Sequence, residues 1–256
     1  MPEETSVSNA EYQSRHGGGE ESVVLPFADR RAAGRLLARA LASFADDPEV
    51  VVLALPRGGV PVGFEVARAL HMPLDVCVVR KLGLPGHVEL AMGAVASGGV
   101  RVLNEEVVVG YGVPSEAIER ATVDETRELR RRESLYRGGR PPLDVRGRTV
   151  LVVDDGLATG TSMRAACLAL RTLHPRTLVV AVPVGAPETC EALLQVADHV
   201  VCLARPRFFF AVSEWYRTFE QTGDAEVQAL LEQAEREGKR PAPLDAGKES
   251  TCEERV

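Results

Sequence analysis

The sequence has no apolar stretch long enough to cross a membrane, and its five cysteines include no Cys-x-x-Cys pair. A membrane-spanning helix needs about 20 consecutive apolar residues, so we expect no membrane association. Scattered cysteines are more typical of small core residues than of disulfides or metal ligands. The start of the sequence lacks a basic flank followed by an apolar segment, so we expect no secretory signal and a cytoplasmic location.

The chain has no net positive charge, and aromatic residues are scarce. The formal net charge of -7 argues against a broad electrostatic grip on nucleic acid, although a local basic patch is left open. Aromatic residues make up only 5% of the chain, and several of them stand together in residues 205–216. With 45% hydrophobic residues over 256 positions, the chain can build an α/β core. We expect one domain over residues 21–236 between disordered tails at 1–20 and 237–256.

Buried strands are predicted where short runs of apolar, mostly β-branched residues recur between segments of helical periodicity. Such runs are typical of strands covered on both faces of a parallel sheet, and their alternation with helices predicts a doubly wound α/β fold. The helix expected within residues 27–44 carries Arg30, Arg31, Arg35 and Arg39, which we interpret as a solvated basic face. The expected strands are residues 50–55, 74–79, 150–153, 178–184 and 199–203.

Residues 150–162 join one of these strands to an acidic pair, Asp154 and Asp155, and then to a small turn that opens a helix. The first N–H groups of a helix lack internal partners and lie at the positive end of its dipole, so such a turn suits a phosphate. The two carboxylates can accept hydrogen bonds from hydroxyl groups or help to hold a divalent cation through water. A phosphate beside a diol describes a ribose 5-phosphate. The turn residues are Ala158, Thr159, Gly160, Thr161 and Ser162.

Three other interpretations of this stretch are weaker. A Walker loop needs a lysine after its last glycine, and position 161 is threonine. The haloacid dehalogenase pattern needs two aspartates separated by one residue, whereas Asp154 and Asp155 are adjacent. A plain strand-to-helix turn with a threonine or serine cap is common, but it would rarely combine an apolar run, tandem acids and the sequence Ala-Thr-Gly-Thr-Ser.

The stretch 150–162 resembles the phosphoribosyl pyrophosphate signature of type I phosphoribosyltransferases, in which an apolar strand and two acids precede a Thr-Gly turn. The resemblance covers roughly residues 25–220 in architecture. It implies a Rossmann-like fold with a flexible lid and a small hood. It also implies a Mg²⁺-dependent transferase of nucleotide metabolism or salvage, which moves ribose 5-phosphate from phosphoribosyl pyrophosphate to a nitrogenous, nucleobase-like acceptor. A homodimer is left open.

The same resemblance gives roles to individual residues. Asp154 and Asp155 would hold the ribose hydroxyls and, through water and substrate, the Mg²⁺ ion, while residues 158–162 would bind the 5-phosphate. A second turn follows the strand at 50–55 and looks like the family's pyrophosphate loop, which often contains a strained peptide. The residues implied in pyrophosphate binding are Arg57, Gly58, Gly59 and Lys81.

The lid and the hood are expected outside the main sheet. The Gly- and Pro-containing segment 83–93 is interpreted as a mobile loop that leads into a hairpin with its turn at 98–99. Glu89 is the catalytic acid/base candidate in this lid, with His87 as the weaker one. In the aromatic segment, Phe208, Phe209, Trp215 or Tyr216 could stack on an acceptor base, or they could form a satellite core.

Two departures from the family bear on the substrate. Enzymes that salvage hypoxanthine and guanine usually have an aspartate three residues after the second acid, where this chain has Ala158. Position 161 is threonine where glycine is frequent. Two other classes of function stay open: a non-catalytic regulator that senses phosphoribosyl pyrophosphate and contacts its partner or RNA through the Arg-rich helix of residues 114–136, and a phosphatase or phosphate-binding module.

Overall fold

The computed structural model describes residues 24–238, except for the side chains of residues 87–89. The tails expected at 1–20 and 237–256 lie outside the described residues, apart from 237 and 238, which end the last helix. No described helix is both long and apolar enough to span a membrane. The elements are α2 (Arg30–Ala40), η1 (Ala42–Phe44), β1 (Val50–Ala54), α3 (Gly59–Leu70), β2 (Leu74–Val76), β3 (Val79–Leu84), β4 (His87–Ala96), β5 (Val100–Leu103), α4 (Glu105–Gly110), α5 (Ser115–Arg137), β6 (Thr149–Val153), α6 (Thr161–Arg171), β7 (Thr177–Val184), α7 (Pro187–Leu193), β8 (His199–Ala204), η2 (Val212–Trp215) and α8 (Asp224–Gly238).

The body of the molecule is built on a five-stranded sheet with the order β2-β1-β6-β7-β8, in which every pair is parallel. Every residue of β1 and β6 is buried, as expected for apolar runs in the middle of a parallel sheet. After β1 the chain turns to β2 on one side, and it later returns to place β6 on the other. The crevice between the ends of β1 and β6 is therefore the topological switch point, where ligands bind in open α/β sheets.

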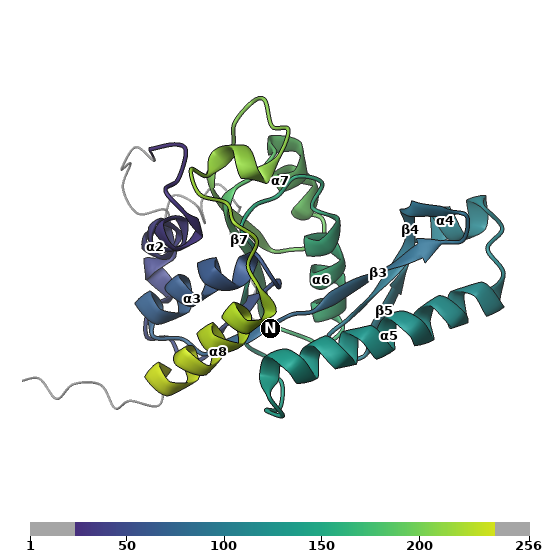
Figure 1. Cartoon of the computed structure of the whole chain (residues 1–256), viewed down its shortest axis with the longest axis horizontal. Coiled ribbons are helices and arrows are strands. Elements are labelled where there is room, and N and C mark those ends of the chain that lie inside the picture. Colours follow the sequence, from purple (N-terminus) through teal and green to yellow (C-terminus); the bar gives the residue numbers. More distant parts are fainter. Residues whose placement is uncertain (1–23, 239–256) are drawn as a thin grey trace, which may run out of the picture.

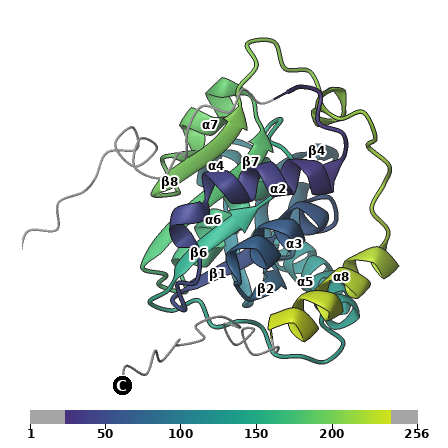
Figure 2. The same ribbon diagram turned by 90° about the vertical axis from the view of Figure 1, so that its left-hand side faces the viewer.

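Helices cover both faces of this sheet, which confirms the predicted doubly wound α/β fold. Alternate residues of β1 and β6, such as Val52 and Leu151, pack with α2 and α3. The residues between them, such as Val51 and Val152, pack with α6 and α7 on the opposite face. Figure 2 shows α2 and α3 in front of the sheet.

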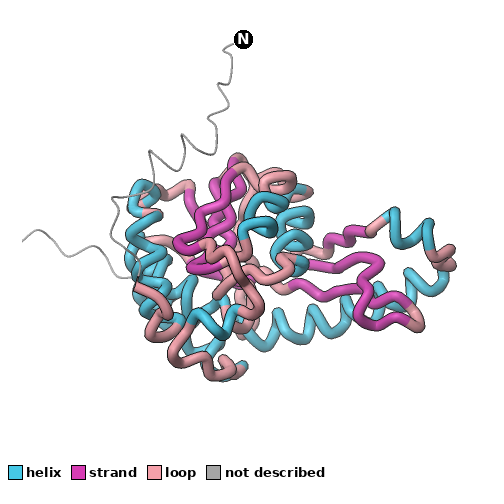
Figure 3. The backbone as a smooth tube through the Cα atoms, turned by 90° about the horizontal axis from the view of Figure 1, so that it is seen from above, coloured by secondary structure: helices cyan, strands magenta, loops and turns pink. Residues whose placement is uncertain are grey.

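A separate arm extends from this body (Figures 1 and 3). It consists of an antiparallel sheet in the order β3-β4-β5, with α4 and the long helix α5 beside it. The base of the arm rests on α6, and its core continues into the body through residues such as Phe64 and Leu129. The arm therefore lies on the same side of the sheet as the turn that opens α6.

The arm corrects two predictions. The strand expected at 74–79 is divided, because β2 ends at Val76 in the main sheet and β3 begins at Val79 in the arm. The segment 83–93, expected as an irregular loop, is mostly a β-hairpin around Gly86, whose φ is 81°. Gly86 forms the turn of this hairpin, and Gly93 lets β4 pass close to β5. A Cβ on Gly93 would lie 2.4 Å from the carbonyl oxygen of Val102. The turn expected at 98–99 is confirmed, because both glycines there have positive φ and connect β4 to β5.

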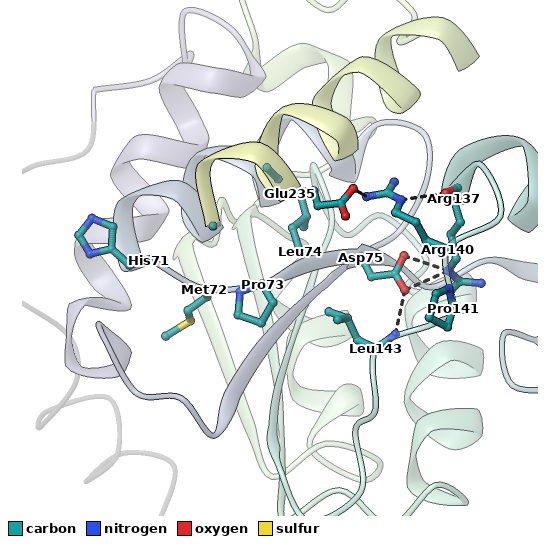
Figure 4. A pocket seen from close by; sticks show the side chains of 12 residues that line it. His71, Met72, Pro73, Leu74, Asp75, Arg137, Arg140, Pro141, Leu143 and Glu235 are labelled. Atoms are coloured by element: carbon teal, nitrogen blue, oxygen red, sulfur yellow. Dashed lines mark hydrogen bonds and ion pairs between the residues drawn. The ribbon is translucent and has the colours of Figure 1, made fainter. Parts of the chain in front are cut away.

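A buried ion pair fastens α5 to the edge of the main sheet (Figure 4). The guanidinium Nε of Arg137 donates to both oxygens of Asp75 at 3.0 and 2.9 Å, and Nη1 donates to Glu133 at 2.8 Å. Leu143 N donates to the same aspartate at 3.2 Å. Residues 124–132 of α5 form intrahelical ion pairs, whereas Arg137 also pairs with Asp75 and so ties the arm to the body.

Candidate active site

The acidic pair lies at the carboxyl end of β6, at the switch point. β6 is completely buried, so its apolar residues fix the backbone while Asp154 and Asp155 stand where the strand ends. The N–H of Asp155 donates to Asp154 Oδ1 at 2.8 Å. Burial first, and the charge of Asp155 second, raises the pKa of the Asp154 carboxyl well above its ordinary value. Burial also raises the pKa of Asp155, against the opposing effect of Arg30.

The turn after β1 is pressed directly against these acids. The peptide bond between Pro56 and Arg57 is cis, and α3 begins at Gly59. A Cβ on Gly59 would lie 2.7 Å from the carbonyl oxygen of Val153. A Cβ on Gly58 would lie 2.1 Å from Asp155 Oδ2, so only glycine lets the backbone come this close. The structure thus brings the predicted pyrophosphate turn and the acidic pair together.

Arg57 itself lies at the rim of this turn. Its Nη1 is 3.7 Å from Asp224 Oδ1 at the start of α8, and both side chains are more than a third exposed. Asp224 also accepts a hydrogen bond from the hydroxyl of Tyr136 at 2.7 Å. The ion pair with Arg57 is long and solvated, so it holds the arginine only weakly.

The turn at 158–162 has the geometry of an anion-binding helix start. Gly160 is the N-cap of α6 with a φ of 64°, and no side chain caps the helix. The first N–H groups of α6 therefore lack a side-chain acceptor, and the hydroxyls of Thr159 and Thr161 lie 3.1 Å apart beside them. The hydroxyl of Thr189 in α7 donates to the carbonyl oxygen of Ala158 at 2.6 Å and so connects the turn to α7. Ser162 is exposed in the first turn of the helix.

Lys81 meets this turn at a cavity between the arm and α6. The cavity has a volume of about 470 Å³ and is lined by Lys81, Thr161 and Arg164, together with acidic residues of α4. Lys81 is exposed on β3 and lines this cavity together with Thr161 of the 158–162 turn. Glu89 lies in β4, and its side chain falls outside what the structure describes, as does that of His87.

The four acceptor-base candidates have different environments. Phe209 and Trp215 stack with ring centroids 6.2 Å apart and are only partly buried. Tyr216 is buried, and its hydroxyl donates to the backbone carbonyl of Asp155 at 2.5 Å. Burial is the main cause that raises its pKa above the ordinary value. Phe208, by contrast, is 73% exposed.

Arg30 is a site residue that sequence reasoning missed. We expected it on a solvated face, but its side chain is only 12% exposed, and its Nε donates to Asp155 Oδ2 at 2.8 Å. The two residues are 125 positions apart, so no local spacing could reveal the pair. The N-cap of the same helix is a local contact by comparison, since the side chain of Asp29 accepts a bond from Ala32 N at 2.7 Å.

The comparisons with known proteins agree with this geometry. The phosphoribosyl transferase domain family matches residues 28–216. Two Mycobacterium tuberculosis proteins, from strains CDC 1551 / Oshkosh and ATCC 25618 / H37Rv, are each 47% identical to the chain over 220 residues, and both carry the provisional name phosphoribosyl transferase. These matches cover 86% of this chain and 49% of each relative, so the chain spans about half the length of the curated relatives.

A solved structure shares the fold. The crystal structure of TT1426 from Thermus thermophilus is 46% identical, with a TM-score of 0.72. The match covers 81% of this chain and 98% of that one. About four-fifths of the chain therefore has a counterpart in a protein of known structure.

Proposed function

Because the chain belongs to the phosphoribosyl transferase domain family, we propose that it moves ribose 5-phosphate from phosphoribosyl pyrophosphate to a nitrogenous acceptor and releases pyrophosphate. The observation that carries this proposal is the contact between the 57–59 turn and the acidic pair, beside an uncapped helix start at 158–162. A close backbone turn, two carboxylates and a phosphate turn at one switch point match the three parts of the donor.

In this proposal the acids act on the ribose. Asp154 and Asp155 accept hydrogen bonds from its hydroxyl groups, and their negative charge favours the positive charge that develops on the sugar ring as pyrophosphate leaves. Both groups lie in a largely buried position, where such an electrostatic effect is stronger than in water.

The phosphate groups are divided between two turns. Backbone N–H groups and hydroxyls at Thr159, Thr161 and Ser162 bind the 5-phosphate. The amides of the 57–59 turn, Arg57 and Lys81 bind the leaving pyrophosphate. The weak pair between Arg57 and Asp224 supports this role, since a doubly charged phosphate can displace a solvated carboxylate.

A magnesium ion fits the site only with help from the substrate. Mg²⁺ usually binds through one or two carboxylates together with substrate phosphates and water, and when bound it would neutralise charge on the departing pyrophosphate. Asp154 and Asp155 offer two carboxylates, and the described part of the chain contains no cluster of three or more His, Cys, Asp or Glu suited to a metal. These two acids would therefore hold the ion through water and substrate.

The acceptor is proposed to lie under the segment 205–216. Phe209 and Trp215 form a partly exposed aromatic pair that could stack on a flat heterocycle. Tyr216 is buried instead, and its hydroxyl donates to the backbone carbonyl of Asp155. Ala158 offers no carboxyl to an acceptor nitrogen, which argues against a hypoxanthine or guanine acceptor that depends on such a group. The proposed acid/base is Glu89, if the arm closes over the site.

Calorimetry with phosphoribosyl pyrophosphate and Mg²⁺, followed by a pyrophosphate-release screen over nucleobases, tests the proposal. We expect saturable binding and turnover with at least one acceptor, and Asp154→Asn should abolish turnover. Failure to bind would refute the proposal. Binding without release over a broad acceptor panel would instead support the alternative, a regulator that senses phosphoribosyl pyrophosphate.

A further inference from the structure

Three contacts hold the guanidinium of Arg30 in one position. Its Nε donates to Asp155 Oδ2 at 2.8 Å, and its Nη1 donates to the carbonyl oxygen of Glu220 at 2.6 Å. The same group lies over the ring of Phe219, 3.7 Å from its centroid. Arginine suits this arrangement because its planar group can donate in two directions and stack on an aromatic face at the same time.

The segment that contacts Arg30 is itself joined to the start of α2. We call residues 215–220 the strap. Phe27 N donates to Trp215 O at 2.9 Å, and Arg217 N donates to Phe27 O at 2.8 Å, as in a short parallel bridge. The ring of Tyr216 lies between those of Phe27 and Phe219, at centroid distances of 5.5 and 5.1 Å. The strap and α2 therefore form one packed unit beside the acidic pair.

Asp155 is held by this unit from two sides. Arg30 engages its carboxylate, and Tyr216 donates to its backbone carbonyl. On a third side, the backbone of Gly58 lies close to the carboxylate, since a Cβ at that position would be only 2.1 Å from Oδ2. One oxygen of the carboxylate is thus held by Arg30 before any ligand arrives, which lowers the ordering cost of binding.

From this geometry we propose that Arg30 is a positioning residue, which holds Asp155 in the orientation that binds the ribose hydroxyls and links that orientation to the strap beside the proposed acceptor site. The inference rests on the proposed function. It adds α2, an element outside the two ligand-binding turns, to the machinery of the site.

The neighbouring arginines of α2 provide a contrast. Arg31 and Arg35 lie 3.6 and 3.7 Å from Glu65, with side chains 44% and 53% exposed. Among the described residues, neither arginine forms an ion pair with Asp154 or Asp155 or a hydrogen bond with the strap. Arg31→Gln is therefore a matched control, because it removes the same charge from the same helix without changing the site.

The test is a double-mutant cycle on the affinity for phosphoribosyl pyrophosphate with Mg²⁺, measured by calorimetry for Arg30→Gln, Asp155→Asn and the double variant. We expect Arg30→Gln to weaken binding by about tenfold or more, and Arg31→Gln by less than about twofold. The double variant should bind no more weakly than Asp155→Asn alone, because Arg30 acts through Asp155. Arg30→Lys keeps the positive charge but loses the planar, forked donor geometry of the guanidinium. It should bind more tightly than Arg30→Gln and more weakly than the wild type.

Emission from Trp215, the one tryptophan of the chain, gives a second readout of the strap. Arg30→Gln should alter it, and Arg31→Gln should not. Arg30→Gln alone leaves the carboxylate of Asp155 without its cation and could fail to fold for that reason. In that case the double variant, which has no carboxylate at position 155, is compared with Asp155→Asn. Equal affinity of Arg30→Gln and the wild type, or additive losses in the cycle, would overturn this inference alone. A wild type that does not bind would overturn the proposed function as well.

Discussion

Gly58→Ala should disturb the acidic pair through steric overlap alone. Gly58 has a φ of -62° and a ψ of -33°, which alanine adopts without strain. The new Cβ, however, would lie 2.1 Å from Asp155 Oδ2 and 2.7 Å from its Cγ. Ordinary contacts of a Cβ are 3.4–4 Å, so the carboxylate must move by more than about 1 Å. That movement would break its 2.8 Å bond to Arg30.

The cost has two parts. Overpacking a well-filled position costs about 1–3 kcal/mol, and losing a hydrogen bond to a charged group costs about 1.5–3 kcal/mol. Relaxation makes the two less than additive, so we expect the free energy of unfolding to fall by about 2–4 kcal/mol. For a domain of this size, each kcal/mol lowers Tm by about 2–4 °C, which gives a decrease of about 5–15 °C.

Thermal unfolding followed by circular dichroism measures this decrease, and calorimetry measures the accompanying loss of affinity for phosphoribosyl pyrophosphate. Gly223→Ala is the matched control, because nothing lies within 4 Å of a Cβ at that position. A Gly58→Ala protein with the Tm and the affinity of this control would refute the close approach of the turn to Asp155.

Three further predictions concern the buried thiols, the ion pair of Arg137 and the hydroxyl of Tyr216. Burial raises the pKa of both Cys77 and Cys167 to about 12, so these thiols should resist alkylation at pH 8 until the protein unfolds, as measured by peptide mapping; rapid labelling in the native protein would contradict it. Arg137→Gln leaves Asp75 buried without its cation and should cost about 3–5 kcal/mol in urea unfolding, whereas the same change at an exposed arginine of α5 should cost less than about 1 kcal/mol. Tyr216→Phe loses the hydrogen bond to the second acid's carbonyl, which should lower the free energy of unfolding by about 0.5–1.5 kcal/mol; no measurable change would show that this bond contributes nothing.

The body of the fold could be predicted because its strands carry a strong local signal. The runs around Val52 and Leu151 are apolar on both faces, and only the middle of a parallel sheet buries both faces of a strand. The strand-to-helix turn at 158–162 was visible for a similar reason, since it combines residues suited to a helix start with a preceding pair of acids. Both signals lie within a few neighbouring residues.

The hairpin around Gly86 and the site contact of Arg30 could not be predicted because their determinants are not local. The glycines and proline around Gly86 indicated a loop, but strand pairing between β3 and β4 overrode that preference. Arg30 shares its helix with several arginines, and only the folded chain brings it to Asp155 and the strap. The same applies to Arg137, which stands in a charged helix but pairs with Asp75 on another element.

Calorimetric titration of the wild-type chain with phosphoribosyl pyrophosphate in the presence of Mg²⁺ tests the central claim most directly. We predict saturable binding of one molecule per chain, weakened by Asp154→Asn. No heat of binding at any accessible concentration would contradict the assignment of the acids and the two turns to this donor.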